Sequence, residues 1–186
     1  MPNLITLNEY KDYVGIASSE QDQKLISVIA YVSDLIKTYC SRNFVDSYAG
    51  GGYTTITEYS NGGSTYYYTK EFPIREVEGV SYSTDLGTTY TAMTLGTDYA
   101  VDIERDRIFI ARGEYIQGVN ALKVQYKGGF KEAPNALKVA TLDLVKYYMK
   151  QEDTPRKTAG NVTMEYITSS DLPAHIKRVL DLFRVV

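Results

Sequence analysis

Apolar residues recur every three or four positions in four stretches of the chain, which is the spacing of a buried helix face. The longest stretch, near residues 19–41, carries them at Leu25, Val28, Ile29, Val32, Leu35, Ile36 and Tyr39. Ile26 and Tyr31 widen this stripe, so the pattern predicts a helix that is buried on nearly every side. Ser18 or Ser19, each three residues before a Gln or Asp, is expected to cap its start.

Three further helices are predicted near residues 7–14, 134–150 and 173–184. Thr6 and Gly15 suit the two ends of the first, and Pro134 suits the first turn of the third. The apolar face of the third helix comprises Leu137, Ala140, Thr141, Leu144, Val145 and Tyr148, and that of the last comprises Ile176, Val179, Leu180 and Phe183. Each helix is expected to pack by one face, and together they form a small bundle.

Between residues 44 and 130 the helical period disappears, and short alternating runs are separated by turn residues. This pattern predicts six to eight antiparallel strands in a compact sandwich or barrel-like sheet. The predicted hairpins join 53–59 to 65–69, 77–83 to 88–94 and 99–103 to 107–110, and a last strand covers 122–126.

The predicted fold class is therefore α+β, with an antiparallel β block inserted between the second and third helices of a bundle. Residues 1–186 are expected to form a single domain, in which 1–43 and 131–186 are the bundle and 44–130 the insertion. The polar segment 151–170 is long for a simple connection, so it is predicted to be a mobile loop.

The composition argues against some classes of function. The 186 residues carry a net charge of −3, which argues against a protein that reads nucleic-acid sequence through a basic surface. The start of the chain has no secretion-signal pattern, and no apolar run approaches the roughly 18 residues that span a membrane, so a cytoplasmic protein is expected. The single cysteine, Cys40, is interpreted as a small core residue in a reducing compartment.

Candidate catalytic groups are few. His175 is the only histidine, and one Cys with one His cannot supply the four ligands of a structural zinc site. Asp98, Asp102, Glu104 and Asp106 would share a face of one continuous strand, which would suit a metal, but intervening arginines favour a solvated hairpin tip. No catalytic, cofactor-binding or metal-binding residue is predicted.

Tyrosine is the unusual residue type, with 18 copies and no tryptophan. Tyrosine favours strands, and it is also enriched at protein interfaces, so both interpretations stay open. In the run Tyr66–Tyr68 at most two rings share a surface, because side chains alternate along a strand. The candidate contacts with a partner or a neighbouring copy are Tyr67, Arg156, Lys157 and Tyr166, although a solvated loop is the alternative for the two basic residues.

Several segments follow one another in a distinctive order: 4–16, 34–44, 72–74, 98–102, 124–130 and a helix after Pro134. Their order and spacing resemble the head–tail connector (adaptor, head-completion) family of tailed bacteriophages, from Leu4 to about Arg184. Family members are mainly helical, so the large β block departs from their pattern.

The resemblance implies a structural protein and no enzyme. About twelve copies would form a ring below the phage portal protein, extend the DNA channel and dock the next neck or tail-completion protein. The free protein would be a ring or a monomer, DNA would only pass through, no membrane would be involved, and the protein would reside in the virion neck after synthesis in the bacterial cytoplasm. Two alternatives are a small-terminase-like DNA-packaging factor, which predicts a basic helix-turn-helix near the N-terminus, and a metal-dependent nuclease built on Asp98–Asp106.

Overall fold

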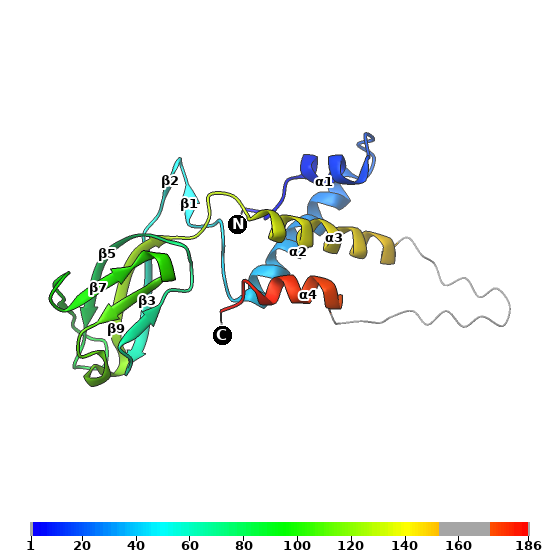
Figure 1. The fold of residues 1–186 in the computed structure, drawn as a ribbon. Coiled ribbons are helices and arrows are strands. Elements are labelled where there is room, and N and C mark those ends of the chain that lie inside the picture. Colours follow the sequence, from blue (N-terminus) through cyan, green and yellow to red (C-terminus); the bar gives the residue numbers. More distant parts are fainter. Residues whose placement is uncertain (1, 153–171, 186) are drawn as a thin grey trace, which may run out of the picture. The chain divides into compact units, whose positions relative to one another are not determined.

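The computed structural model describes residues 2–152 and 172–185, which belong to two compact units. Residues 1–42 and 132–186 make a helical unit, and residues 43–131 make a β unit (Figure 1). The predicted α+β class, with the β block between the second and third helices, is confirmed. Nearly all of the predicted loop 151–170 lies outside the described residues, and a single domain stays a prediction. No described helix is long and apolar enough to cross a membrane.

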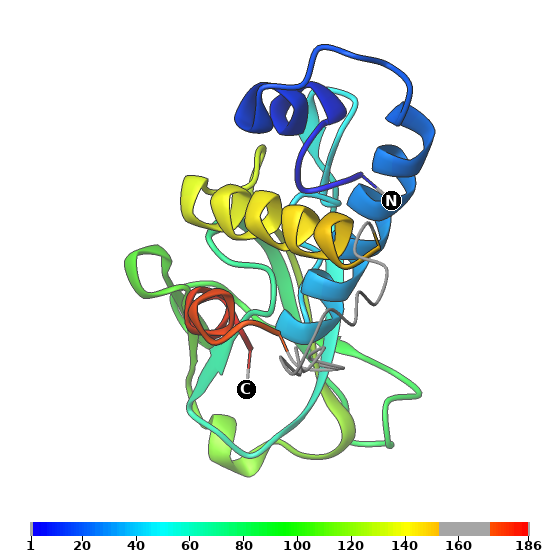
Figure 2. The ribbon, with the colours of Figure 1, turned by 90° about the vertical axis from the view of Figure 1, so that its right-hand side faces the viewer.

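The helical unit contains α1 (Leu7–Val14), α2 (Asp22–Cys40), α3 (Asn135–Glu152) and α4 (Ala174–Asp181). Figures 1 and 2 show α3 between α1 and α4, with α2 crossing it. Both predicted caps of α1 are confirmed, because Thr6 forms a capping box with Glu9 and Gly15 ends the helix in the left-handed conformation. The backbone carbonyl of Pro134 accepts a hydrogen bond from the Lys138 backbone N–H in the first turn of α3.

Two predictions about α2 are wrong. The helix begins at Asp22 without a side-chain cap, and the Ser18 hydroxyl accepts a hydrogen bond from the Glu20 backbone N–H instead. Ile26 and Tyr31 are 42% and 55% exposed, so α2 is buried on one face and not on nearly every side. These two apolar side chains therefore lie outside the core.

The core of the helical unit comes from one face of each longer helix. Its buried members include Leu25, Ile29, Val32 and Ile36 of α2, Leu137, Leu144 and Val145 of α3, and Ile176 and Leu180 of α4. Cys40 is buried among them, and its thiol donates to the Leu180 carbonyl at 3.6 Å. Burial raises the pKa of the Cys40 thiol to about 11, so it stays protonated and unreactive at neutral pH.

Nine strands build the β unit: β1 (Tyr48–Ala49), β2 (Gly52–Tyr53), β3 (Ile56–Gly62), β4 (Tyr66–Tyr68), β5 (Ile74–Tyr82), β6 (Thr91–Ala92), β7 (Tyr99–Asp102), β8 (Arg107–Ile110) and β9 (Gln117–Gly128). One sheet has the order β3-β9-β5-β6, a second has the order β4-β8-β7, and β1 pairs with β2. All these pairs are antiparallel. Buried residues of both larger sheets, among them Ile74, Val80, Ile108 and Val124, form one core.

The predicted hairpins are confirmed in two cases and wrong in one. The pairs β5–β6 and β7–β8 form as predicted. The first hairpin is wrong, because β3 pairs with β9 and β4 pairs with β8. The glycine-rich link at 62–63 carries the chain from one sheet to the other, where the Gly63 backbone N–H donates to the Ile116 carbonyl at 2.7 Å.

Candidate interaction surface

Of the four residues predicted to contact partners, the structure describes only Tyr67. Arg156, Lys157 and Tyr166 lie outside the described residues. Tyr67 is half-buried on β4 and packs against the core of the β unit, whereas its neighbours Tyr66 and Tyr68 are exposed on the opposite face. The predicted alternation of the three rings is therefore confirmed, and a partner contact of Tyr67 stays a prediction.

The hydroxyl of Tyr67 belongs to a buried polar network. It donates to Glu58 Oε2 at 2.5 Å, and the Tyr126 hydroxyl donates to Glu58 Oε1. Burial and the adjacent Glu58 carboxylate raise the pKa of both tyrosines above the ordinary range, so both hydroxyls remain donors. Tyr126 in turn accepts from the Glu71 backbone N–H at 3.0 Å.

Glu71 is the second buried carboxylate of the β unit. It accepts hydrogen bonds from the backbone N–H groups of Asn43 at 2.6 Å and Phe44 at 3.0 Å. The network therefore fixes the first residues of the β unit to its core, which is a structural role.

The acids between Asp98 and Asp106 are also engaged. Asp102 Oδ2 accepts from Arg107 at 2.9 Å and from Arg105 at 3.2 Å, and hydrogen bonding from Arg107 and then Arg105 lowers its pKa. Asp98 accepts from the Thr94 backbone N–H, and Asp106 accepts from that of Ile74. In the described part of the chain, no group of three His, Cys, Asp or Glu side chains is arranged to hold a metal ion.

An apolar concave surface lies on the helical unit. A groove of about 350 Å³ runs between α3 and α4, and its walls are Asn135, Ala136, Val139, Ala140, Asp143, His175, Ile176 and Val179. We call it the α3–α4 groove. Val139 is 48% exposed although it is apolar, because it lies beside the buried face of α3 and not on it. A concave apolar surface of this kind suits a protruding apolar side chain of a partner.

The groove continues into a more polar hollow of about 300 Å³ toward the C-terminal end of α3. The hollow shares Asp143, His175 and Ile176 with the groove and adds Lys146, Tyr147, Lys150 and Pro173. Asp143 accepts from the Tyr13 hydroxyl at 2.8 Å and keeps its negative charge. With Lys146 and Lys150 against one Asp143, the hollow has a small excess of positive charge.

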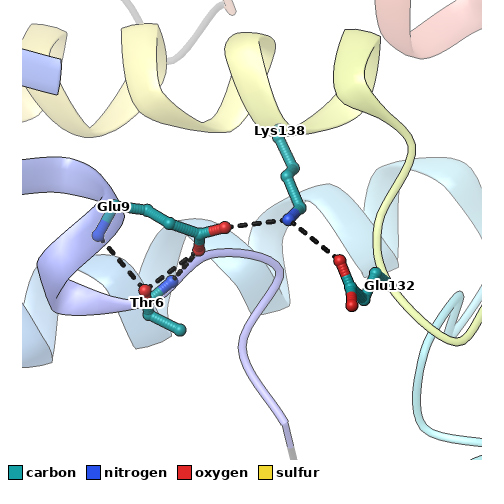
Figure 3. A network of polar contacts seen from close by, with 4 residues as sticks. All are labelled: Thr6, Glu9, Glu132 and Lys138. Atoms are coloured by element: carbon teal, nitrogen blue, oxygen red, sulfur yellow. Dashed lines mark hydrogen bonds and ion pairs between the residues drawn. The ribbon is translucent and has the colours of Figure 1, made fainter. Parts of the chain in front are cut away.

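A polar network fixes α1 against α3 and so supports one wall of the groove (Figure 3). Lys138 Nζ lies 2.8 Å from Glu9 Oε1 and 3.6 Å from Glu132 Oε2. Glu9 also accepts from the Thr6 backbone N–H at 2.7 Å, while the Glu9 N–H donates to the Thr6 hydroxyl at 3.2 Å. The α1 cap and the α1–α3 ion pair thus share one carboxylate.

The same network shifts two pKa values. Partial burial raises the pKa of Glu9, but the hydrogen bonds from Lys138 and Thr6 together outweigh it, so the pKa lies below its ordinary value. The hydrogen bond to Glu9 raises the pKa of Lys138. Both groups are therefore charged at neutral pH, and the ion pair is present.

The sequence does not indicate the groove. Periodicity identifies residues that point into a core, whereas Val139 and Ala136 lie outside the predicted stripe of α3. The one signal in the sequence was Val139, an apolar residue beside the buried face of an amphipathic helix. Val139 lies in a groove only because α4 packs next to α3.

Known proteins resemble this chain in sequence and in fold. The model of the head completion protein family matches residues 3–186. The head completion protein of Escherichia phage T5 is 31% identical over 115 residues, which cover 56% of this chain and 64% of that protein. The match thus spans less than two thirds of the length of this relative.

Solved structures with a similar fold come from particles of a gene transfer agent (GTA). A chain from the neck of the empty GTA particle, computed with C6 symmetry, has a TM-score of 0.56 at 13% identity, covering 98% of this chain and 90% of that one. A chain from the neck of the native particle, computed with C12 symmetry, has a TM-score of 0.52 at 14% identity, covering 97% and 88%. At these identities the likeness concerns the fold.

Proposed function

Because the chain belongs to the head completion protein family, we propose that it is a structural head–tail connector of a tailed phage. Copies of the chain form a ring below the portal protein in the neck of the virion. The ring extends the DNA channel and docks the next neck or tail-completion protein. Its role is assembly, and we assign it no catalytic step.

The observation that carries this proposal is the family match along residues 3–186, which includes both units. Its fold is similar to that of chains from GTA necks, where C6 and C12 symmetry was applied. A closed ring of identical chains uses a heterologous interface, in which each copy offers two different surfaces. The α3–α4 groove is suited to be one of them.

Charge is consistent with a channel for DNA. The net charge of −3 gives the chain little attraction for phosphates, so DNA passes without stable binding. The small-terminase-like alternative requires a basic N-terminal region, but α1 and α2 contain four Asp or Glu and three Lys. No described feature favours that alternative or the nuclease.

The test uses the full chain, alone and with the portal protein of its phage, imaged by negative-stain electron microscopy. We expect rings with about twelve-fold symmetry, formed by the free chain or only on portal particles. Portal particles that gain no density at saturating chain would contradict the proposal. Phage lacking the gene should accumulate DNA-filled heads without tails, and joined, infectious particles in its absence would also contradict it.

A further inference from the structure

The β unit has an exposed apolar corner made by a turn and by the start of a strand. The turn, residues 83–90, links β5 to β6, and residues 118–120 lie at the start of β9, where its register against β3 shifts. Leu86 and Val119 are 71% and 58% exposed. A Cβ placed on Gly118 would lie 4.0 Å from Leu86 Cδ2, so the turn and the start of β9 are adjacent. We call residues 85–87 and 118–120 the Leu86 corner.

The backbone of this corner is strained. Leu86 has a φ of 59° and Asn120 a φ of 51°, both in the left-handed region that non-glycine residues rarely adopt. For leucine this conformation is unusual, because it lacks the short polar side chain with which Asn compensates. Strain of this kind persists only where surrounding contacts fix it, and it is concentrated at functional sites.

A dense set of hydrogen bonds fixes the turn. Asp85 Oδ1 accepts from the Ser83 hydroxyl at 2.6 Å and from the backbone N–H groups of Thr88 at 3.2 Å and Thr89 at 2.8 Å. Asp85 Oδ2 accepts from the Thr89 hydroxyl at 2.6 Å. None of these hydrogen bonds involves the Leu86 side chain, so the turn holds position 86 outward independently of the residue there.

The start of β9 is fixed to the turn and to β3. The Tyr90 hydroxyl donates to the Asn120 carbonyl at 2.9 Å, and the Asn120 N–H donates to Asn61 Oδ1 at 3.2 Å. The corner is thus preorganised, which reduces the entropy that a partner contact would cost. Within the β unit an exposed leucine in a strained turn contributes little to the core, so a role in contact accounts for it better than a role in folding.

We propose that the Leu86 corner of one copy binds in the α3–α4 groove of the neighbouring copy in the ring. This contact rests on the proposed connector function and names the two surfaces of its interface. A heterologous ring contact joins two different, complementary surfaces of the same chain. An exposed apolar corner and an apolar groove offer such a pair. Leu86 would contact Ala136, Val139 and Val179, the accessible apolar walls of the groove.

Charge favours the same pairing. The β unit contains eleven Asp or Glu against eight Lys or Arg, and Asp85 adjoins Leu86. The groove ends at Lys146 and Lys150. Hydrogen bonds from Ser83 and then Thr89 keep the pKa of Asp85 far below its ordinary value, so its charge persists at any physiological pH. An acidic, apolar corner is therefore complementary to an apolar groove with a basic end.

The direct test is a cysteine pair, Leu86→Cys with Val139→Cys, in the full chain assembled into rings and then oxidised. The native Cys40 is buried and stays in place. We expect a ladder of cross-linked multimers on a non-reducing gel, absent from each single variant. The matched control pairs Leu95→Cys, which is exposed elsewhere on the β unit, with Val139→Cys, and it should give no ladder.

Failures of the two proposals are distinguishable. Rings that form without the 86–139 cross-link overturn this contact and leave the connector function standing. If neither the free chain nor portal particles give rings, the connector function fails and the contact fails with it.

A second variant separates contact from folding. Leu86→Gly removes the side chain and also relieves the strain, because glycine adopts positive φ freely. We expect the denaturation midpoint to stay level or rise while the concentration needed for ring assembly increases about tenfold or more. Unchanged ring assembly would overturn the proposal. If these unchanged rings no longer bound the portal protein, the corner would contact the portal and not the neighbouring copy. Leu95→Gly is the control.

Discussion

The two units stabilise their interiors in different ways. The core of the helical unit is apolar, and its buried cations lie against backbone carbonyls, as Lys37 does at 2.7 Å from the Pro2 oxygen. The β unit instead buries two carboxylates, Glu58 and Glu71, which accept hydrogen bonds from tyrosine hydroxyls and backbone N–H groups. Five of the six described non-glycine residues with positive φ also lie in the β unit.

This difference shows how each unit specifies its structure. Helices with an apolar face bury it in many related arrangements, and packing then selects one of them. A buried carboxylate is tolerated only when its partners are in place, so it selects a particular pairing of strands. We therefore expect truncation of apolar residues to have the largest effect on the helical unit, and removal of a polar partner to have an unusually large effect on the β unit.

The largest effect is expected from truncation of the helical core. Ile29→Ala or Leu144→Ala should lower the free energy of unfolding by about 2–5 kcal/mol, because each removes a buried side chain and leaves a cavity. Denaturant unfolding followed by circular dichroism measures this. Ile26→Ala, on the exposed side of the same helix, is the control, with an expected change within about 0.5 kcal/mol. Wild-type midpoints for both core variants would refute this packing.

Glu58→Gln tests the polar core of the β unit. The substitution keeps the shape of the side chain but gives it donors where two tyrosine hydroxyls and the Lys70 N–H already donate. A loss of about 1–3 kcal/mol in the free energy of unfolding is expected. Glu76→Gln, which removes an exposed ion pair with Lys127, should cost about 0–1 kcal/mol. Equal losses in the two variants would mean that the buried carboxylate stabilises the β unit no more than an exposed one.

The cap of α1 should have a smaller effect. Thr6→Ala removes the hydroxyl that accepts from the Glu9 N–H, and about 0.5–2 kcal/mol should be lost. Amide hydrogen exchange along residues 7–14 measures the local part of this loss. Thr6→Ser keeps the hydroxyl, so its exchange rates should match those of the wild type; fast exchange in both variants would mean that the methyl group matters instead.

The smallest effect is the pH dependence of the Glu9–Lys138 pair. Because the folded pKa of Glu9 lies below its ordinary 4.5, its contribution is present above about pH 4.5 and is lost as pH falls through the folded pKa. Lys138 has a raised pKa, so its contribution is lost only as pH rises beyond about 10.5.

The variant Glu9→Gln isolates this contribution. It should be less stable than the wild type by about 0–1 kcal/mol at pH 7, with the difference shrinking below pH 4. Unfolding curves at several pH values measure it, and Glu20→Gln, an exposed acid outside the network, provides the baseline. A difference that grows as the pH falls would contradict the assigned direction of the Glu9 shift.

The predicted elements agree best with the structure where residues close in the sequence determine the element. The first helix was bounded correctly because Thr6 and Glu9 act within its first turn and Gly15 acts on its last turn. The cap of α2 was wrong because a serine three residues before a Gln or Asp is common, and nothing local distinguishes Ser18 from a loop residue. The β3–β4 hairpin was wrong because a glycine-rich turn also suits a chain that changes sheets.

By itself the sequence determined where helices form, where most turns lie, and the order of segments that resembles the connector family. These follow from residue period and capping, which act over a few positions. Only the tertiary structure decided that β9 joins β3 to β5, that Glu58 is buried beneath Tyr126, 68 positions away, and that Val139 borders a groove while Leu86 protrudes. Burial and strand pairing depend on residues that folding brings together from distant parts of the sequence. The residues next to each position in the sequence therefore do not predict them.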